Sequence, residues 1–497
     1  MKRRMNQVVH LLVRRWTVLV AIAMLASFFL VLFAGKGQDV WFDENYSIIL
    51  AQQSVPELLH LTSVDAHPPL FYLLLKLWGS VFGWSELSLR SMSALLCAVT
   101  VGIVALLLRR LFTIRVALVS LPFLALAPFW LRYGYEIRMY ALAGLIGAFA
   151  SYVLIRAVDA KDNKRWWGLY AVLVAAGMYT LYMTIVVWVA HFVWLLITNR
   201  RRLFRQPWLW SFVGAVVLFL PYVSTVLFQL THSALPGIGV VLNLTHIGDV
   251  ISMVMIYTPE WSVAGWSAFG IIVVFGLLTY LLDRSRRQMN PAGRRSLGFL
   301  LSLVVVPPLF FVVISLPMSQ PFFLERYLAH VILFSYALIG VTVALGWRYG
   351  YRRASGSLAA LSLFLLGWGL GQLVQAGNFN YERMQRPQTA KVRQLVDCKK
   401  SYVIADDPYT YINDQYYFKD CDFHFYSPTP LLKWGGYAWL ANSSAQITDP
   451  AKVNAQRVVH LYWHNSLPTF RPDGRYTLVS SVTFDQQTTD TYELKSE

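Results

Sequence analysis

One stretch decides the fold class: between Arg90 and Arg109 the chain reads SMSALLCAVTVGIVALLL, eighteen residues without a charged side chain. About 20 predominantly apolar residues cross the hydrocarbon core of a bilayer as a helix, so this run predicts a membrane span. Runs of similar length recur along the first three quarters of the chain. We predict eleven spans: Thr17–Gly35, Ser91–Leu108, Val116–Leu131, Met139–Ile155, Trp166–Leu181, Tyr182–Ile197, Trp208–Leu230, Val263–Leu282, Leu297–Leu316, Tyr327–Leu345 and Ser355–Val374.

The composition agrees with an α-helical polytopic membrane protein. Of the 497 residues, 56% are hydrophobic and 14% are charged, whereas roughly 25% charged residues are usual in soluble domains. The apolar content excludes a disordered chain, and three cysteines in this length exclude a disulfide-stapled secreted domain. In a soluble protein the net charge of +17 would suggest nucleic-acid or anionic-surface binding, so the position of the charges decides its meaning.

The distribution of Lys and Arg predicts the orientation in the membrane. Thr17–Gly35 follows a basic stretch but is too long for a signal peptide, and Leu32-Phe33-Ala34 lacks the small residues of a cleavage site. We expect an uncleaved anchor with the N-terminus in the cytoplasm. The cytoplasmic segments then hold 24 Lys and Arg against three acidic residues, and the short outer segments hold six Lys and Arg. The positive charge is thus mostly a topology signal, and we expect a multi-pass protein of the cell (plasma or inner) membrane with no nucleic-acid partner.

Two apolar segments of the first outer loop (36–90) do not fit as spans. Pro69–Phe82 is about 14 residues long and carries Lys76, and counting it as a span would put the arginines of the 109–115 turn outside. We predict juxtamembrane helices in the outer leaflet: this one, and a short amphipathic helix near Ser54–Leu61 that begins with Ser54 as its N-cap.

The composition changes after Val374. Residues 376–497 carry 13 basic and 13 acidic side chains and alternating runs at Ser401–Ala405, Arg457–Trp463 and Arg475–Phe484. We therefore divide the chain into a transmembrane module (1–375) and a small α/β domain (376–497) on the outer face. Cys398 and Cys421 both fall in this domain and are candidates for a disulfide in an oxidising compartment, with two unpaired thiols as the alternative.

The informative charges are those predicted at the outer membrane surface. Asp43 and Glu44 stand between aromatic residues a few positions after the first span. A further cluster, Arg132, Glu136 and Arg138, and also Arg326, fall at the predicted outer ends of other spans. Charges at such positions are expensive to keep and often functional. The simpler alternatives are a solvated acid pair at 43–44, and an i,i+4 pair of Arg132 with Glu136 beside an Arg138 that contacts a lipid headgroup.

These residue types suit sugar transfer from a lipid-linked phosphate. A carboxylate can act as general base and take the proton of the attacking hydroxyl. Arginines can neutralise the charge that grows on the leaving phosphate. An acid and arginines at the outer ends of several spans would meet in one outward-facing cavity.

Other polar residues of the first outer loop leave alternatives open. Lys76 and Arg90 could reach lipid phosphate or the phosphate of the donor. Asp65 and His67 are too few to define a metal site, and His67 is more simply a structural histidine that bonds the loop backbone. A divalent metal therefore stays open, with Asp43 and His67 as weak candidate ligands.

Three motifs resemble a known family. Trp41-Phe42-Asp43-Glu44, then Asp65-Ala66-His67-Pro68-Pro69-Leu70-Phe71-Tyr72, then Glu86-Leu87-Ser88-Leu89-Arg90 are similar to the start of bacterial GT-C glycosyltransferases of the protein O-mannosyltransferase and aminoarabinose transferase superfamily (glycosyltransferase family 39-like). Glu136-Ile137-Arg138-Met139-Tyr140 and Phe323-Leu324-Glu325-Arg326-Tyr327 resemble later motifs. The resemblance is strongest over residues 36–160 and does not extend to 376–497.

The resemblance implies an inverting, GT-C type membrane enzyme that uses a polyprenyl-phosphate-linked sugar. It implies that Asp43 is the catalytic base, with Glu44 beside it. Arg138 and Arg326 would bind the donor phosphate, and we include Lys76 and Arg90 as further candidates. The motifs also place Asp65, His67, Glu136, Tyr140 and Tyr327 as candidates for the substrate pocket. The acceptor (glycan, lipid or protein) does not follow from the resemblance.

Two other functions compete with a mannosyltransferase-like enzyme of the cell-envelope glycan. A transporter or flippase of lipid-linked glycans would typically show repeats and charges near mid-span, but here the charges cluster near one predicted surface. A scaffold that displays the C-terminal domain would leave Asp43, Glu136 and Arg138 unexplained. The sequence therefore favours an outward-facing glycosyltransferase, with the transporter as the alternative.

Overall fold

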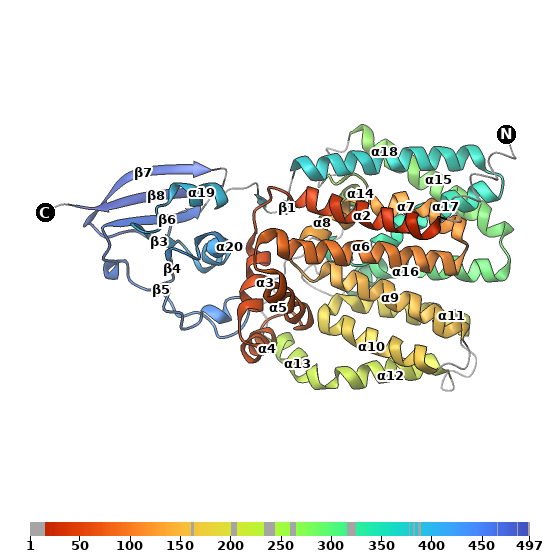
Figure 1. Cartoon of the computed structure of the whole chain (residues 1–497), viewed down its shortest axis with the longest axis horizontal. Helices are drawn as coiled ribbons and strands as arrows, with labels where there is room; N and C mark the ends of the chain where they lie inside the picture. Colours follow the sequence, from red (N-terminus) through yellow and green to blue (C-terminus); the bar gives the residue numbers. More distant parts are fainter. Residues whose placement is uncertain are drawn as a thin grey trace. The chain divides into compact units, whose positions relative to one another are not determined.

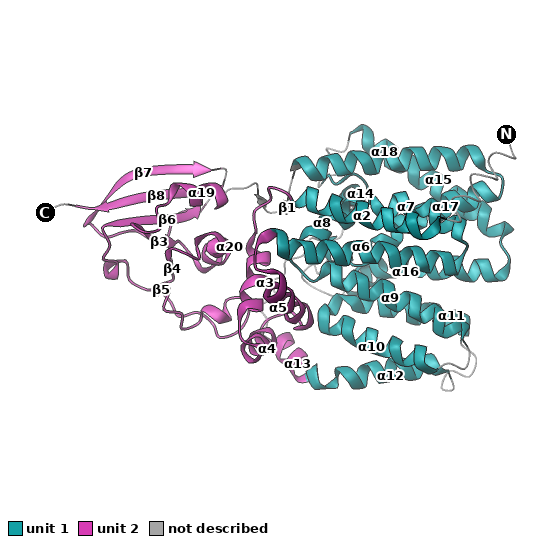
Figure 2. Ribbon diagram, viewed as in Figure 1, with its two compact units in different colours: residues 1–35, 87–223, 235–376 teal, residues 36–86, 224–234, 377–497 magenta. Residues whose placement is uncertain are grey.

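The computed structural model describes residues 15–160, 164–199, 206–232, 244–258, 265–315, 325–376, 378–380, 383–385, 389–464, 466–484 and 486–495. The basic residues before Arg15, and Phe323 and Leu324 of the last motif, lie outside these ranges. The chain divides into two compact units (Figure 2). Unit 1 comprises residues 1–35, 87–223 and 235–376, and unit 2 comprises 36–86, 224–234 and 377–497. Unit 2 therefore contains the first outer loop together with the C-terminal segment.

Unit 1 is a bundle of helices, most of them long and lying side by side (Figure 1). Its helices are α2 (Trp16–Gly35), α6 (Glu86–Leu111), α7 (Ile114–Ala125), α8 (Pro128–Tyr135), α9 (Tyr140–Asp159), α10 (Lys164–Thr180), η1 (Tyr182–Thr184), α11 (Ile185–Asn199), α12 (Pro207–Phe219), η3 (Leu220–Tyr222), α14 (Leu244–Ile256), α15 (Trp266–Gln288), α16 (Pro291–Ser315), η5 (Glu325–Leu328), α17 (Leu333–Arg348) and α18 (Arg352–Ala376).

The described parts of all eleven predicted spans fall largely on helices, whereas Val263, Ala264 and Leu316 lie outside the described residues. Fewer of these helices are long enough to cross a membrane. Within the described residues eight helices have the required length and hydropathy, or nine if the bent pair α7–α8 is one span. The predicted spans Trp166–Leu181 and Tyr327–Leu345 correspond to α10 and α17, which have 17 and 16 residues. By this criterion the described residues account for eight or nine of the eleven predicted spans, and the chain is a multi-pass helical membrane protein as predicted.

Helix α2 has large apolar side chains on its exposed face and small side chains on its buried face. Its exposed face carries large apolar residues, including Ile22 (55% exposed), Phe29 (62%) and Phe33 (58%). Its buried face carries small residues such as Ala23, Ser27 and Ala34. Small side chains let helices approach closely, and large apolar ones face lipid at no cost. The helix is thus apolar all round, as a membrane span requires.

The predicted span Val116–Leu131 is broken into two helices. Helices α7 and α8 meet at a bend of 61° after a break at residues 126–127. Pro128 is the first residue of α8, and Ala127 before it has extended backbone (φ −68°, ψ 98°). A residue that precedes proline avoids the helical conformation, so Pro128 ends the first helix and starts the second. All eight residues of α8 are buried.

The first outer loop folds into three short helices of unit 2: α3 (Phe42–Gln52), α4 (Val55–Val64) and α5 (Leu70–Phe82). Ser54 is the N-cap of α4 as predicted, because its Oγ accepts a hydrogen bond from the Glu57 amide (3.3 Å). The 13-residue α5 is too short to span and exposes Leu77, Val81 and Phe82 on one side. Both helices thus form where the sequence predicted. Helix α13 (Val223–His232) completes the helical part of this unit.

The C-terminal part of unit 2 is a mixed α/β fold, and strands form in each of the three predicted runs. Its elements are β1 (Asn378–Asn380), β2 (Arg383–Gln385), α19 (Thr389–Leu395), β3 (Tyr402–Ala405), α20 (Pro408–Phe418), β4 (Asp422–Tyr426), η6 (Ala438–Leu440), β5 (Gln446–Ile447), η7 (Pro450–Lys452), β6 (Arg457–Trp463), β7 (Tyr476–Phe484) and β8 (Gln487–Leu494). The six-stranded sheet has the order β5-β4-β3-β6-β8-β7. Strands β3 to β6 pair in parallel, whereas β8 pairs antiparallel with both β6 and β7.

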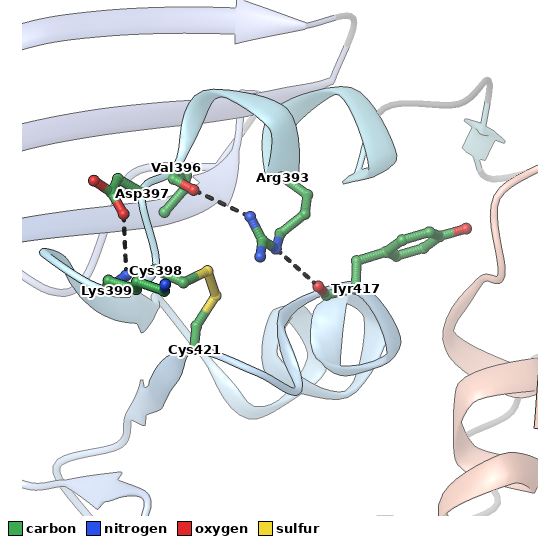
Figure 3. The surroundings of a disulfide bond; sticks show 7 residues. All are labelled: Arg393, Val396, Asp397, Cys398, Lys399, Tyr417 and Cys421. Atoms are coloured by element: carbon green, nitrogen blue, oxygen red, sulfur yellow. Dashed lines mark hydrogen bonds between the residues drawn. A yellow bond between two sulfur atoms is a disulfide. The ribbon is translucent and has the colours of Figure 1, made fainter.

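Helix α20 crosses between the parallel strands β3 and β4 and is fixed at both ends. Asp407 caps its N-terminus by accepting from the Thr410 amide (2.8 Å). At its C-terminus Arg393 Nε donates to the Tyr417 carbonyl (3.1 Å). The structure also joins Cys398 to Cys421, so a disulfide connects the turns that follow α19 and α20 (Figure 3).

A buried carboxyl, Asp414, links α20 to α19 and β8. Its Oδ1 accepts from Thr389 Oγ1 (3.1 Å) and Asn413 Nδ2 (2.9 Å), and its Oδ2 accepts from Gln487 Nε2. Burial raises the pKa of Asp414 to about 7, although these hydrogen bonds oppose the shift. The side chain is fully buried, so its ionisation is coupled to folding of the domain.

We predict that Asp414→Asn makes stability less dependent on pH. Because folding raises this pKa from 3.8 to about 7, the carboxyl destabilises the fold progressively as the pH rises through that window, by about 4 kcal/mol in total. The melting temperature in detergent, measured from pH 4.5 to 8, should therefore fall less in the variant than in the wild type. Asp420→Asn, which changes an exposed carboxylate, should follow the wild type. Equal slopes for Asp414→Asn and the wild type would contradict this coupling.

Candidate active site

The two adjacent carboxylates at the start of α3 have different environments. Glu44 is fully buried, and its Oε2 accepts from the Trp41 amide (3.4 Å), so it helps to begin its own helix. Asp43 is half-exposed, and its carbonyl accepts from Ser47 Oγ (2.9 Å). Of the pair, Asp43 is the more accessible and suits proton transfer, whereas Glu44 suits a structural role.

Asp65 and His67 pair with each other in unit 2. His67 Nδ1 lies 3.3 Å from Asp65 Oδ2, and Tyr46 also hydrogen-bonds to this carboxylate. Burial alone would raise the pKa of Asp65, but the bonds from His67, Ala66 and Tyr46 outweigh it and hold the pKa below its usual value. No group of three or more His, Cys, Asp or Glu placed to hold a metal occurs among the described residues. The contact of Asp65 with His67 links two residues of the turn before α5.

Lys76 and Arg90 each contact the C-terminal end of a helix. Lys76 Nζ donates to two carbonyls at the end of α3. One belongs to Gln53, just after the helix (2.7 Å), and the other to Ala51 in its last turn (3.4 Å). Arg90 Nη1 donates to the carbonyl of Gly35 (2.6 Å), the last residue of α2, and is 3% exposed. A cation at a helix C-terminus satisfies carbonyls and meets the negative end of the dipole. Both of these candidate phosphate ligands thus have a structural role.

Unit 1 buries an ion pair at the end of α8. Arg132 Nη2 lies 3.1 Å from Glu136 Oε1, and the two side chains are 3% and 2% exposed. The i,i+4 pairing considered from the sequence therefore forms. The guanidinium also lies over the rings of Tyr133 (5.2 Å) and Tyr135 (5.1 Å), which support it as cation–π partners. Arg132 Nη1 is buried and donates no hydrogen bond within the described structure.

Arg138 and Tyr140 continue this cluster into the start of α9. Arg138 is 3% exposed and Tyr140 is 6% exposed, two and four residues after Glu136. Tyr140 packs edge-to-face against Tyr133, with ring centroids 4.9 Å apart. The bend at Pro128 puts this charged segment at the end of a broken span, where charges are least costly to keep.

The segment Glu325-Arg326-Tyr327 belongs to the same neighbourhood of unit 1. Burial raises the pKa of Glu325, while the charges of Arg326 and Arg132 act in the opposite direction. Glu325 thus connects η5 electrostatically with α8, and Tyr327 stacks on Phe311 at 5.8 Å. The sequence prediction did not include Glu325 among the site residues, and it considered Arg132 only in the cluster with Glu136 and Arg138. The available signal was that each is one of the few charged residues beside an apolar span.

Unit 1 contains an apolar pocket of about 350 Å³, and some of its lining residues directly follow the segment Glu325-Arg326-Tyr327 in the sequence. It is lined by α14, α15, α16, α17 and the stretch Leu328–Ile332, which begins two residues after Arg326. All of its lining residues are apolar except Ser335 and Tyr336, and Tyr336 donates its hydroxyl to the Val254 carbonyl. The size is within the roughly 300–1,000 Å³ of ligand pockets, and the lining suits a hydrocarbon chain.

The candidate residues are divided between the two units. Unit 2 contains Asp43, Glu44, Asp65, His67 and Lys76. Unit 1 contains Arg90, Glu136, Arg138, Tyr140, Arg326 and Tyr327. Within unit 1 the structure brings α8 and η5 together through Arg132, Glu136, Glu325 and Arg326, and within unit 2 it pairs Asp65 with His67.

Comparison with known proteins supports this reading of the fold. Residues 66–228 match the model of the family described as dolichyl-phosphate-mannose-protein mannosyltransferase. ArnT from Cupriavidus metallidurans superposes with a TM-score of 0.60 in both its apo form (13% identity) and its form bound to undecaprenyl phosphate (14% identity), over 96% of this chain and 97% of ArnT. No curated protein sequence matches significantly.

A more distant structure has part of the same fold. The apo oligosaccharyltransferase of Archaeoglobus fulgidus superposes with a TM-score of 0.53 at 11% identity, over 82% of this chain and 64% of its own length. At such identities the structures establish the fold, and the sequence match lies in the segment that carries His67, Arg90, Glu136 and Arg138. The chain thus has the fold of ArnT, and over residues 66–228 its sequence is similar to the dolichyl-phosphate-mannose-protein mannosyltransferase family.

Proposed function

We propose that the chain transfers a sugar from a polyprenyl-phosphate-linked donor to an acceptor hydroxyl on the outer face of the membrane. The observation that carries this proposal is the combination, within unit 1, of two buried arginines (Arg132 and Arg138) and the half-buried Arg326 with an apolar pocket. Arg326 lies two residues before Leu328, and Leu328 is the first residue of the stretch Leu328–Ile332 that lines the pocket. A lipid phosphate needs both parts: cations for its head and a hydrocarbon-lined cavity for its chain. Undecaprenyl phosphate, which is bound in one of the two ArnT structures, has this chemistry.

The reaction divides into a donor and an acceptor part. The acceptor oxygen attacks the anomeric carbon while the bond from that carbon to the phosphate oxygen breaks, so the configuration inverts. Asp43 takes the acceptor proton as general base. Arg138 and Arg326 neutralise the charge that the phosphate gains, with Arg132 and Glu136 beside them.

The charge distribution supports the proposed orientation. The segments that hold 24 Lys and Arg would face the cytoplasm, and the acidic first outer loop would face outward with the C-terminal domain. A disulfide between Cys398 and Cys421 fits an oxidising outer compartment.

Asp43→Asn should abolish transfer without preventing folding. The amide cannot accept the proton, so kcat should fall by about 100-fold or more, whereas binding of the polyprenyl-phosphate donor should persist. Glycosylated product measured by mass spectrometry, and donor binding measured by native mass spectrometry, test both statements. Glu57→Gln, at an exposed carboxylate of α4, is the matched control. Full activity of Asp43→Asn would exclude this residue as the base.

Arg326→Lys should weaken the use of the donor more than it weakens folding. Lysine keeps the charge but loses the two-pronged hydrogen bonding of the guanidinium, so KM for the donor should rise by about tenfold. Arg353→Lys, at an exposed residue of α18, should leave KM unchanged. If KM does not change in Arg326→Lys, the phosphate contact belongs to Arg138 or Arg132 instead.

A substitution that fills the apolar pocket should lower activity with long-chain donors more than activity with short-chain donors. Ile251→Trp adds volume to the lining and should lower activity with a long polyprenyl-phosphate donor, while a donor with a single short prenyl chain should be affected much less. Val213→Trp, at a 43% exposed position of α12, is the control. Equal loss with both donors would indicate general damage to unit 1 and would argue against the pocket as the prenyl site.

A further inference from the structure

The start of α3 is held by the C-terminal α/β fold within unit 2. Residues 39–45, here called the base segment, lead into α3 and contain Asp43. Asp39 Oδ2 accepts from the amides of Thr389 (2.8 Å) and Ala390 (3.3 Å), the first two residues of α19. These amides have no partner within their helix, so a carboxylate 350 residues away in the chain caps it. Asp39 is 7% exposed, which makes this contact costly to break.

One face of α20 contacts the rest of the base segment. Tyr409, Asn413 and Tyr417 are spaced by four residues and therefore lie along the same side of the helix. The Tyr409 ring stacks on Phe42 with centroids 4.4 Å apart and an interplanar angle of 3°. The Asn413 carbonyl accepts from Asn45 Nδ2 (2.5 Å), which also donates to the Val40 carbonyl (3.2 Å).

Tyr417 makes the contact nearest to the start of α3. Its hydroxyl accepts from the Val40 amide (2.9 Å) and donates to Asp39 Oδ1 (3.4 Å). Figure 3 shows the ring extending from the end of α20 away from the disulfide. The disulfide and Arg393 fix the end of the helix from which this side chain projects. The base segment is thus fixed at Asp39, Val40, Phe42 and Asn45, on both sides of Asp43.

We propose that the C-terminal α/β domain positions the catalytic base, and that Tyr417 is a positioning residue for Asp43. This inference rests on the proposed function, in which Asp43 takes the acceptor proton. A base must lie within hydrogen-bond reach of the proton it removes, and a misplacement of about 1 Å can cost roughly 100-fold in rate. Asp43 is only half-buried, so the position of the backbone that carries it contributes to where its carboxylate lies.

The test is Tyr417→Phe in the full-length protein, because this change keeps the ring and removes only the hydroxyl. We expect kcat to fall by about tenfold, with the donor KM and the fraction that binds undecaprenyl phosphate unchanged. Hydrogen exchange of the backbone amides from Val40 to Tyr46 should become faster. Tyr416→Phe is the matched control, because its hydroxyl donates to the Trp84 carbonyl (3.3 Å), outside the base segment. It should retain wild-type kcat and exchange.

Phe42→Leu provides a second route if Tyr417→Phe does not fold. It removes the stack with Tyr409 without breaking a hydrogen bond, and it should lower kcat and speed exchange in the same way. If Tyr417→Phe and Phe42→Leu match Tyr416→Phe in kcat and exchange while Asp43→Asn is inactive, the positioning role is wrong and the base assignment stands. If Asp43→Asn is active, the base assignment itself fails, and the positioning proposal fails with it.

Discussion

The cost of burying a charge without a partner governs how both units are built. In hydrocarbon or in a protein interior a charged group loses its hydration, so it needs an ion pair, hydrogen bonds or a helix end to compensate. Arg132 meets Glu136 and two tyrosine rings. Arg90 meets the last carbonyl of α2, and Asp39 meets the first amides of α19. Each of these contacts fixes one element against another, so the few buried charges also determine how the local structure is held.

Much of the helical fold follows from the sequence because membrane solvent leaves a strong local signal. A run of apolar residues such as Ser91–Leu108 has few alternatives to a helix, since every backbone group must be bonded internally. Length was the weaker part of the prediction. A hydropathy run does not show that Pro128 divides Val116–Leu131, or that α10 and α17 stop short of the length of the other spans. The orientation of the spans remains a prediction from the positions of Lys and Arg.

The candidate site was less predictable because its contacts are made far apart in the chain. The charges near Glu136 stand out in an apolar sequence, and the motif with Asp43 resembles a known family. The carbonyl partners of Lys76 and Arg90 leave no trace in composition or spacing, so both were open candidates for the donor phosphate. Likewise, no feature of the sequence predicts the contact of Asp39 with Thr389. The boundary at residue 375 followed the change in composition, whereas the contacts group 36–86 with 377–497.

That grouping has a consequence for how an active molecule forms. The base segment depends on α19 and α20, and these helices depend in turn on Asp414, which bonds Thr389 and Gln487. Gln487 opens β8, which pairs with β6 inside the sheet. Pairings between distant strands form slowly, because loop closure must precede the contacts that repay it. The cluster of unit 1 also joins distant segments, since Glu325 of η5 is coupled to Arg132 of α8. Both parts of the proposed site therefore depend on long-range contacts, and the proposed base is fixed only when β8 has joined the sheet.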